Sequence, residues 1–265
     1  MRAWRALGHE VRLALIALQF LTRVPIPSWI GFESQWLHAS ARHFPLVGML
    51  VGTCAAAVLW ASAWWWPMPI AVVLSIVATV WLTGGFHEDG LADTCDGLGG
   101  AVSRERALEI MKDSRLGSYG ALGLVLMLAL KALALVSLAN VDLVQACGAI
   151  VFAHTVSRAA TVVLLRVLPY AGDPAHAKAK PMAQRVSHMG VFIALAWGVF
   201  IAVPLCAIAV RPVTTATIAT IACACVCGRW FKKRLGGYTG DTLGATQQLT
   251  EVACYLAWLA SALRG

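Results

Sequence analysis

Seven carboxylates lie in the segment 84–120, which is flanked on both sides by long apolar runs. The whole chain has thirteen acidic residues, so more than half of them lie in this one segment. Besides Glu105, they are Glu88, Asp89, Asp93, Asp96, Glu109 and Asp113. Charges at the edge of an apolar run are costly unless something compensates them. Carboxylate oxygens suit divalent cations such as Mg²⁺ or Mn²⁺. The segment therefore indicates metal-assisted chemistry on an anionic substrate.

The spacing of these carboxylates predicts two acidic helix faces. If the chain is helical from Asp89 onward, then Asp89, Asp93 and Asp96 are spaced i, i+4, i+7 and share one face. Glu109 and Asp113 are spaced i, i+4 on a second expected helix. Two such helices facing each other would form a site for two cations, which can stabilise the attacking and leaving oxygens of a phosphoryl displacement.

Two other interpretations of the segment need no such site. The carboxylates could form a solvated helix face paired with nearby arginines, and Glu105, off the second acidic face, fits that interpretation better. Matched carboxylate faces, however, repel one another without a cation. His87 beside Glu88 suggests a zinc peptidase only superficially, because Leu91 stands where the second histidine of HExxH should be.

The composition is that of a polytopic membrane protein. Hydrophobic residues make up 59% and charged residues only 13%, whereas a soluble domain carries about 25% charged residues. Apolar blocks of roughly twenty residues recur, each long enough to cross a bilayer. We therefore predict an all-α bundle of about seven transmembrane helices that forms one integral membrane domain over 1–265. The expected spans are 44–66, 69–86, 119–138, 143–167, 189–210, 213–230 and 244–263.

Residues 1–43 are predicted to form a cytoplasmic amphipathic segment. Within it, Val11, Leu15 and Leu18 share one face of an expected surface helix over 9–23. Pro25 and Pro27 would end that helix. The triple tryptophan 64–66 is typical of a membrane–water interface.

Basic residues set the expected orientation. The three longer polar connections, 87–118, 168–188 and 230–243, each carry several lysines or arginines, so the positive-inside rule places them in the cytoplasm. Every candidate site then faces the cytoplasm. The net charge of +8 is spread over these loops, which fits topology and attraction of an anionic substrate better than nucleic-acid binding.

Further residues are candidates for substrate binding. Gly240 and Asp241 lie in a glycine-rich turn before the last span, where backbone N–H groups at a helix start favour phosphate. Arg158 lies deep in the fourth span and should face the site or pair with an acid. Arg23 and Arg115 are additional candidates. Lys131, midway in the third span, has no assigned role.

Four runs carry a family resemblance, in order and across essentially the whole chain. They are Leu21–Pro25 (LTRVP), Gly84–Gly97 (GGFHEDGLADTCDG), Ile110–Gly117 (IMKDSRLG) and Gly236–Ala245 (GGYTGDTLGA). The chain resembles the adenosylcobinamide-GDP ribazoletransferase family, the bacterial cobalamin (5′-phosphate) synthases called CobS. The resemblance implies a Mg²⁺-dependent enzyme of the bacterial inner membrane. Such enzymes join α-ribazole, or its 5′-phosphate, to adenosylcobinamide-GDP with release of GMP.

A more distant resemblance links the acidic segment to the CDP-alcohol phosphotransferases. Asp93-xx-Asp96-Gly97 matches the first half of their signature, and Glu109-xxx-Asp113 matches the second half with glutamate for its first aspartate. A phosphatidyltransferase of lipid synthesis is therefore one rival function. A cation-coupled transporter is another, although its acids would be spread over several spans.

The resemblance suggests roles for individual residues. Metal ligands would be the carboxylates Glu88, Asp89, Asp93, Asp96 and Asp113. Glu109 would assist, and Asp113 is also the expected general base. Lys178 and Lys180 resemble loop lysines of other family members and are expected to contact phosphate. Self-association and contacts with other cobalamin-assembly enzymes are left open.

Overall fold

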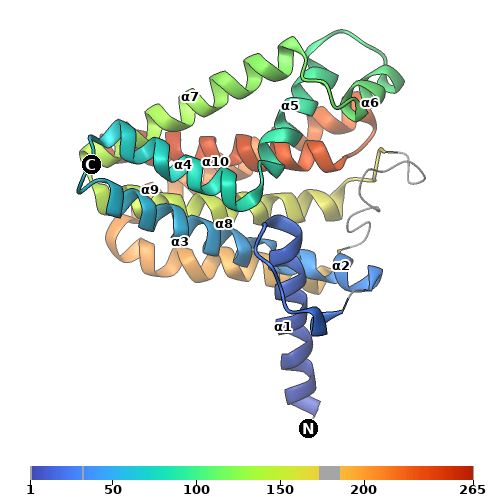
Figure 1. Cartoon of the computed structure of the whole chain (residues 1–265), viewed down its shortest axis with the longest axis horizontal. Helices are drawn as coiled ribbons and strands as arrows, with labels where there is room; N and C mark the ends of the chain where they lie inside the picture. Colours follow the sequence, from blue (N-terminus) through green and yellow to red (C-terminus); the bar gives the residue numbers. More distant parts are fainter. Residues whose placement is uncertain (1, 32, 173–185, 265) are drawn as a thin grey trace.

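The chain folds into a helical bundle (Figure 1). The computed structural model describes residues 2–31, 33–172 and 186–264, so Lys178 and Lys180 lie outside the described residues. Two 3₁₀ turns, Ser28–Ile30 and Ala41–His43, interrupt the N-terminal part. The α-helices are α1 (Arg2–Leu21), α2 (Ser34–Ser40), α3 (Phe44–Ser62), α4 (Met68–Thr83), α5 (Phe86–Gly99), α6 (Arg104–Lys112), α7 (Ser118–Val141), α8 (Leu143–Val167), α9 (His188–Leu235) and α10 (Gly240–Ala262).

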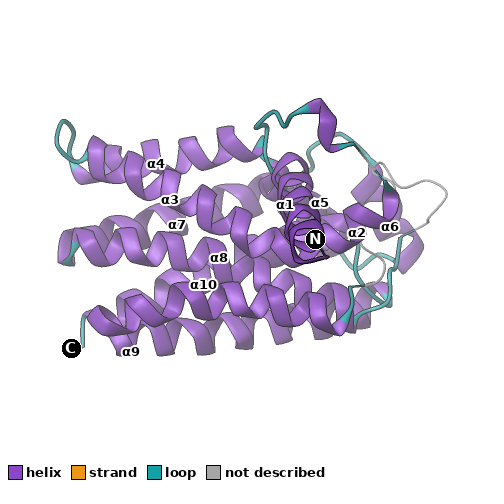
Figure 2. Cartoon of the chain, turned by 90° about the horizontal axis from the view of Figure 1, so that it is seen from below, coloured by secondary structure: helices purple, strands orange, loops and turns teal. Residues whose placement is uncertain are grey.

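Helices α3, α4, α7, α8, α9 and α10 run alongside one another (Figures 1 and 2). The short connections between α3 and α4 and between α7 and α8 lie at one end, together with the C-terminus. The longer connections around α5 and α6 lie at the opposite end. We call this opposite end the polar end. The predicted separation of short and long connections is therefore confirmed.

Helix α9 is a hairpin of two arms. It contains 48 residues, which would extend about 72 Å if straight. Its helical geometry breaks at Ala209, where φ is −152° and ψ is 53°. Pro204 and Pro212 flank the break, and proline removes a backbone hydrogen bond and kinks a helix.

The two ends of α9 lie beside the same end of α8. At the start of α9, His188 Nε2 accepts a hydrogen bond of 2.8 Å from Arg166 Nη2. Just after its end, the Tyr238 N–H donates to the carbonyl of Pro169 at 2.9 Å. The chain therefore crosses the bundle twice within α9, as the two expected ranges 189–210 and 213–230 predict.

Among the described residues, four helices are long and apolar enough to cross a membrane. They are Gln35–Ser62, Ser118–Val141, Leu143–Val167 and His188–Leu235. The bent pair Met68–Thr83 and Phe86–Gly99 would make a fifth span. Each of the seven expected ranges is occupied by helix, but seven complete spans stay a prediction.

Helix α1 crosses the direction of the bundle, because it stands upright in Figure 1 and is seen end-on in Figure 2. Its packed face carries Leu13, Ile16 and Ala17, all buried. Val11 is 49% exposed, so it does not share the packed face. Of the predicted face, Leu18 packs against the core and Val11 does not, and the position of α1 on a membrane surface stays a prediction.

The exposed tryptophans Trp64, Trp65 and Trp66 lie on the turn between α3 and α4. That turn is at the end opposite the polar end. Large amphipathic rings concentrate at membrane–water interfaces. Their position fits an interfacial belt far from the acidic segment.

The arrangement predicts which ends can be labelled from outside the cell. In a cysteine-free background, Trp65→Cys and Val141→Cys should react with a membrane-impermeant maleimide applied to intact cells. Ser103→Cys and Ser187→Cys, at the basic polar end, should react only after the cells are permeabilised. Labelling of Ser103→Cys and Trp65→Cys from the same side would contradict this topology.

Candidate functional site

Two consecutive glycines turn the chain from α4 into the acidic helix α5. Gly84 and Gly85 have φ values of 73° and 72°, a region that glycine adopts without strain. The two helices meet at 89°. A Cβ atom on Gly84 would lie 2.7 Å from Arg23 Nε, so Arg23 covers this corner. The prediction that the chain is helical from Asp89 onward is confirmed.

Helix α5 packs closely against the start of α10. A Cβ atom on Gly90 would lie 2.9 Å from the carbonyl oxygen of Asp241 and 3.3 Å from Gly244 Cα. Only glycine allows two backbones to approach this closely. The first turn of α10 therefore meets α5 between Asp89, which is exposed, and Asp93, which is half-buried. Asp241 thus comes from a distant part of the sequence to the acidic segment.

Asp96 forms the N-terminal cap of α7. Its Oδ2 accepts the Gly117 N–H at 2.8 Å, and its Oδ1 accepts the Gly120 N–H at 2.8 Å. A carboxylate at this position satisfies backbone donors and favours the positive end of the helix dipole. The sequence predicts Asp96 as a metal ligand. In the structure, both of its carboxylate oxygens accept backbone hydrogen bonds from the start of α7.

The second acidic face is not a single helix face, which differs from the prediction. Helix α6 ends at Lys112, and Asp113 follows with a ψ of 130°, in extended backbone. Arg115 donates to the Asp113 carboxylate from Nε at 3.0 Å and from Nη2 at 2.5 Å, which raises the pKa of Arg115. Glu109 is exposed and pairs with Arg106 at 2.9 Å. Of the two expected acidic helix faces, the structure therefore has only the one on α5.

Two arginines join neighbouring segments at the polar end through hydrogen bonds to backbone carbonyls. Arg104, on α6, donates to the carbonyls of Leu235 at 2.6 Å and Ala171 at 3.3 Å. Arg234, near the end of α9, donates to the carbonyls of Leu98 at 3.3 Å and Gly100 at 3.0 Å. These carbonyls lie in or just after the last turn of a helix, where intrahelical donors run out.

The chain after α8 pairs with the chain before α10. Tyr238 exchanges backbone hydrogen bonds with Pro169 at 2.9 Å and Ala171 at 2.8 Å. Gly237 lies so close to Pro169 that any side chain there would clash. Burial raises the pKa of Tyr238 to about 12, so its hydroxyl keeps its proton at neutral pH. The described parts of all three long connections thus meet at one end, as expected.

A small cavity brings together two predicted substrate residues. Arg158, on α8, and Gly240, at the start of α10, both line it, with His87 of α5. Its volume of about 30 Å³ is enough for one or two water molecules. Thr239 caps the start of α10 through reciprocal hydrogen bonds with Thr242. The site therefore sits where α5, α8 and α10 converge.

A buried polar cluster lies deeper in the bundle. Glu251, fully buried on α10, pairs with Lys131 Nζ of α7 at 2.5 Å. The Tyr255 hydroxyl and the Gln247 amide also donate to Glu251, at 3.0 Å and 2.5 Å. His154 of α8 lies 3.4 Å from the same carboxylate. This pairing accounts for Lys131, which the sequence left without a role.

The cluster connects to the acidic helix. The Gln248 amide donates to Gln247 Oε1 and to Glu88 Oε1, both at 2.9 Å. Among the described residues, the other oxygen of Glu88 is buried without a hydrogen-bond partner. Sequence reasoning missed Glu251 and the two glutamines. Their signal was polar residues inside an otherwise apolar segment, which mark a functional or paired site.

Within the described residues, no group of three or more histidine, cysteine or acidic side chains is arranged to hold a metal ion. Asp89 and Asp93 nevertheless lie one turn apart on α5. Mg²⁺ is commonly held by one or two carboxylates together with substrate phosphates and water. The oxygen donors present therefore fit Mg²⁺ bound together with a phosphorylated substrate.

A profile of the family described as cobalamin-5-phosphate synthase, CobS, matches residues 13–259. The chain belongs to the CobS family. It is 64% identical over 257 residues to the adenosylcobinamide-GDP ribazoletransferase of Leptothrix cholodnii, covering 96% of this chain and 97% of the relative. Proteins of the same name from Shewanella sp. strain ANA-3 and Shewanella piezotolerans are 46% and 42% identical, covering 94% and 98% of this chain and the same shares of the relatives. No solved structure matches the chain.

Three of the runs that resemble CobS meet at the polar end. The run Gly84–Gly97 forms the bend and most of α5, and Gly236–Ala245 forms the turn and first residues of α10. Ile110–Gly117 joins α6 to the cap of α7. The fourth run, Leu21–Pro25, contacts the bend through Arg23, whose N–H donates to the Leu82 carbonyl at 2.8 Å. The four CobS motifs therefore lie close together in the fold.

The buried ion pair predicts a non-additive effect on stability. Glu251→Gln should lower the free energy of unfolding by about 3–5 kcal/mol, because it leaves the buried Lys131 cation unpaired. Adding Lys131→Met should restore most of that loss. Unfolding in detergent micelles measures both, with Lys233→Met as an exposed control. A double variant as unstable as Glu251→Gln would contradict the pairing.

Proposed function

We propose that this chain is a membrane enzyme that transfers the cobinamide-phosphate part of adenosylcobinamide-GDP to α-ribazole or its 5′-phosphate. The match to the CobS family over residues 13–259 carries the proposal. The relatives' name describes this transfer. The convergence of the family motifs on one polar end supports a reaction site there.

The reaction breaks a phosphoanhydride bond and forms a phosphoester bond. An oxygen of ribazole attacks the phosphorus that carries cobinamide, and the bond from that phosphorus to the GMP phosphate breaks. GMP leaves with the bridging oxygen, and the proton of the attacking hydroxyl passes to a base. The protein must therefore hold two anionic groups, orient the hydroxyl and accept one proton.

The acidic face of α5 supplies the metal ligands in this proposal. Asp89 and Asp93 would hold Mg²⁺, or Mn²⁺ in its place, together with substrate phosphates. Bound there, the cation would neutralise charge that develops on the phosphoryl oxygens. Asp96 would support the site by holding the start of α7 in place, since both its oxygens accept backbone donors.

Basic and backbone groups surround this face. Arg158 and Gly240 line the cavity behind α5, and Arg23 covers the bend before it. Asp241, in the first turn of α10, lies against Gly90. We propose that these residues contact the substrates. Lys178 and Lys180 keep their proposed phosphate contacts, although they lie outside the described residues.

Asp113 keeps its proposed role as general base, with Glu109 assisting. The Arg115 guanidinium donates to the Asp113 carboxylate. Arg115 is also a candidate for contact with substrate phosphate. An incoming phosphate would compete with Asp113 for the same guanidinium, so substrate binding would free the base.

We further propose that the bundle spans the bacterial inner membrane seven times, with the polar end in the cytoplasm. The two arms of α9 count separately, and α10 forms the last span. Glu251, Gln247 and Tyr255 of α10 bond to one another within the bundle, which lowers the cost of placing them in a membrane.

The two rival functions fit less well. A phosphatidyltransferase of lipid synthesis would carry the full signature of that group, whereas Glu109 stands in place of its first aspartate in the second half. The relatives are named ribazoletransferases instead. A transporter would place its acids along a path, but the buried Glu251 is held by Lys131, Tyr255 and Gln247.

The proposed metal ligands predict a sharp contrast between two acidic residues. Asp93→Asn should lower kcat by about a hundredfold or more, because loss of a ligand weakens stabilisation of the transition state. Glu105→Gln should change kcat little, since Glu105 is exposed at the start of α6. Release of GMP from adenosylcobinamide-GDP by purified variants measures the effect. Equal losses at both positions would favour a solvated acidic face.

Metal removal tests the cofactor separately. Chelation of divalent ions from the purified protein should abolish GMP release, and Mg²⁺ or Mn²⁺ should restore it. Full turnover after rigorous removal of divalent ions would refute the proposed role.

A further inference from the structure

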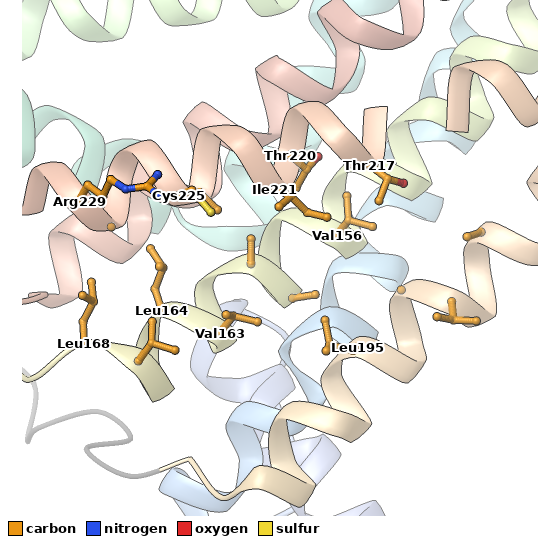
Figure 3. Close-up of a pocket in the computed structure, with 18 of the residues that line it drawn as sticks. Val156, Val163, Leu164, Leu168, Leu195, Thr217, Thr220, Ile221, Cys225 and Arg229 are labelled. Atoms are coloured by element: carbon orange, nitrogen blue, oxygen red, sulfur yellow. The ribbon is translucent and has the colours of Figure 1, made fainter. Parts of the chain in front are cut away.

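A large apolar groove lies on the side of α8 that faces away from the candidate site. It has a volume of about 730 Å³, within the range of about 300–1,000 Å³ typical of ligand sites. Figure 3 shows it between α8 and the two arms of α9. Representative lining residues are Val156, Ala160, Leu195, Gly198, Ile221 and Ala224.

The groove and the candidate site occupy different faces of one helix. Arg158 and Thr161 of α8 line the small cavity beside α5. Val156, Ala160 and Val163 line the groove. Successive residues of a helix rotate by about 100°, so these two sets point in different directions. The groove is therefore not part of the candidate active site.

Small residues along the groove leave the packing between these helices incomplete. Gly198 of the first arm, Ala160 of α8 and Gly228 of the second arm all line the groove. A Cβ atom on Gly198 would have no heavy atom closer than 3.8 Å, so there is unfilled space beside it. Neighbouring side chains such as Val199 and Ile221 are 60% and 58% exposed. In a membrane, this surface faces hydrocarbon.

One end of the groove is basic. Arg229 and Lys232 line it and are both exposed. Figure 3 shows Arg229 at one end of an otherwise apolar lining. They lie in the last two turns of α9, close to Arg234, which is bonded to the polar end. Neither side chain makes a hydrogen bond or ion pair with another described residue. Both cations can therefore bind a lipid headgroup at this end of the groove.

We infer that the groove is a binding site for an anionic phospholipid. An acyl chain would fill the apolar length between α8 and the two arms of α9. The lipid phosphate would bind Arg229 and Lys232 at the basic end. The combination of a long hydrocarbon lining and two cations at one end matches a phospholipid better than a water-soluble phosphate, for which the apolar length has no use.

Native mass spectrometry of the purified protein tests the preference for an anionic headgroup. After delipidation, the protein should bind phosphatidylglycerol in strong preference to phosphatidylcholine. Arg229→Gln with Lys232→Gln should lower that preference by roughly tenfold or more. Arg211→Gln with Lys233→Gln removes the same charge away from the groove and should leave the preference unchanged. Equal loss in both double variants would overturn the proposal.

Filling the groove tests the acyl chain. Gly198→Phe should abolish retention of the lipid, because the ring would occupy the free space beside α8. Ala222→Phe places the same ring on an exposed part of α9 outside the groove and should have no effect. Full retention by Gly198→Phe would overturn the proposal. A dimer that Gly198→Phe disrupts, with no lipid bound to the parent, would overturn it in favour of a second copy of the chain.

Discussion

The arrangement of the bundle depends on one buried ion pair, Lys131 of α7 with Glu251 of α10. Each charge alone would be strongly unfavourable in the interior of a membrane protein, so the two helices are constrained to meet at this point. Tyr255 and Gln247 satisfy further hydrogen-bonding positions of the carboxylate. Because a helix is rigid over a few turns, fixing Glu251 also fixes where the start of α10 presents Asp241.

Glycine residues determine how closely the acidic helix α5 approaches α10. The bend at Gly84 and Gly85 turns α5 across the end of the bundle, and the contact of Gly90 with α10 removes the space that side chains would occupy. The acidic face is thus held by backbone contact rather than by a flexible loop. Rigid positioning of this kind is what phosphoryl transfer requires, since its catalysis depends mainly on placement and electrostatics.

The sequence predicts local features better than it predicts which distant residues contact one another. Apolar blocks and prolines foretold the helices, including the two arms of α9, and the spacing of Asp89 and Asp93 foretold one acidic face. The spacing of the acidic residues did not predict that α6 ends before Asp113. Periodicity shows which residues share a helix face but does not show at which residue the helix ends. Nor was the pairing of Lys131 with Glu251, since residues 120 positions apart meet only through tertiary packing.

Taken with the cap that Asp96 provides, these contacts close into a ring. Glu88 of α5 joins α10 through Gln248, α10 joins α7 through the buried ion pair, and α7 returns to α5 through Asp96. A ring differs from a linear chain of contacts, because cutting it once leaves every helix still joined by the remaining path. Loss of any one link therefore costs its own stabilisation but leaves the three helices joined, whereas loss of two links detaches one helix from this network, so that the combined cost exceeds the sum of the separate costs.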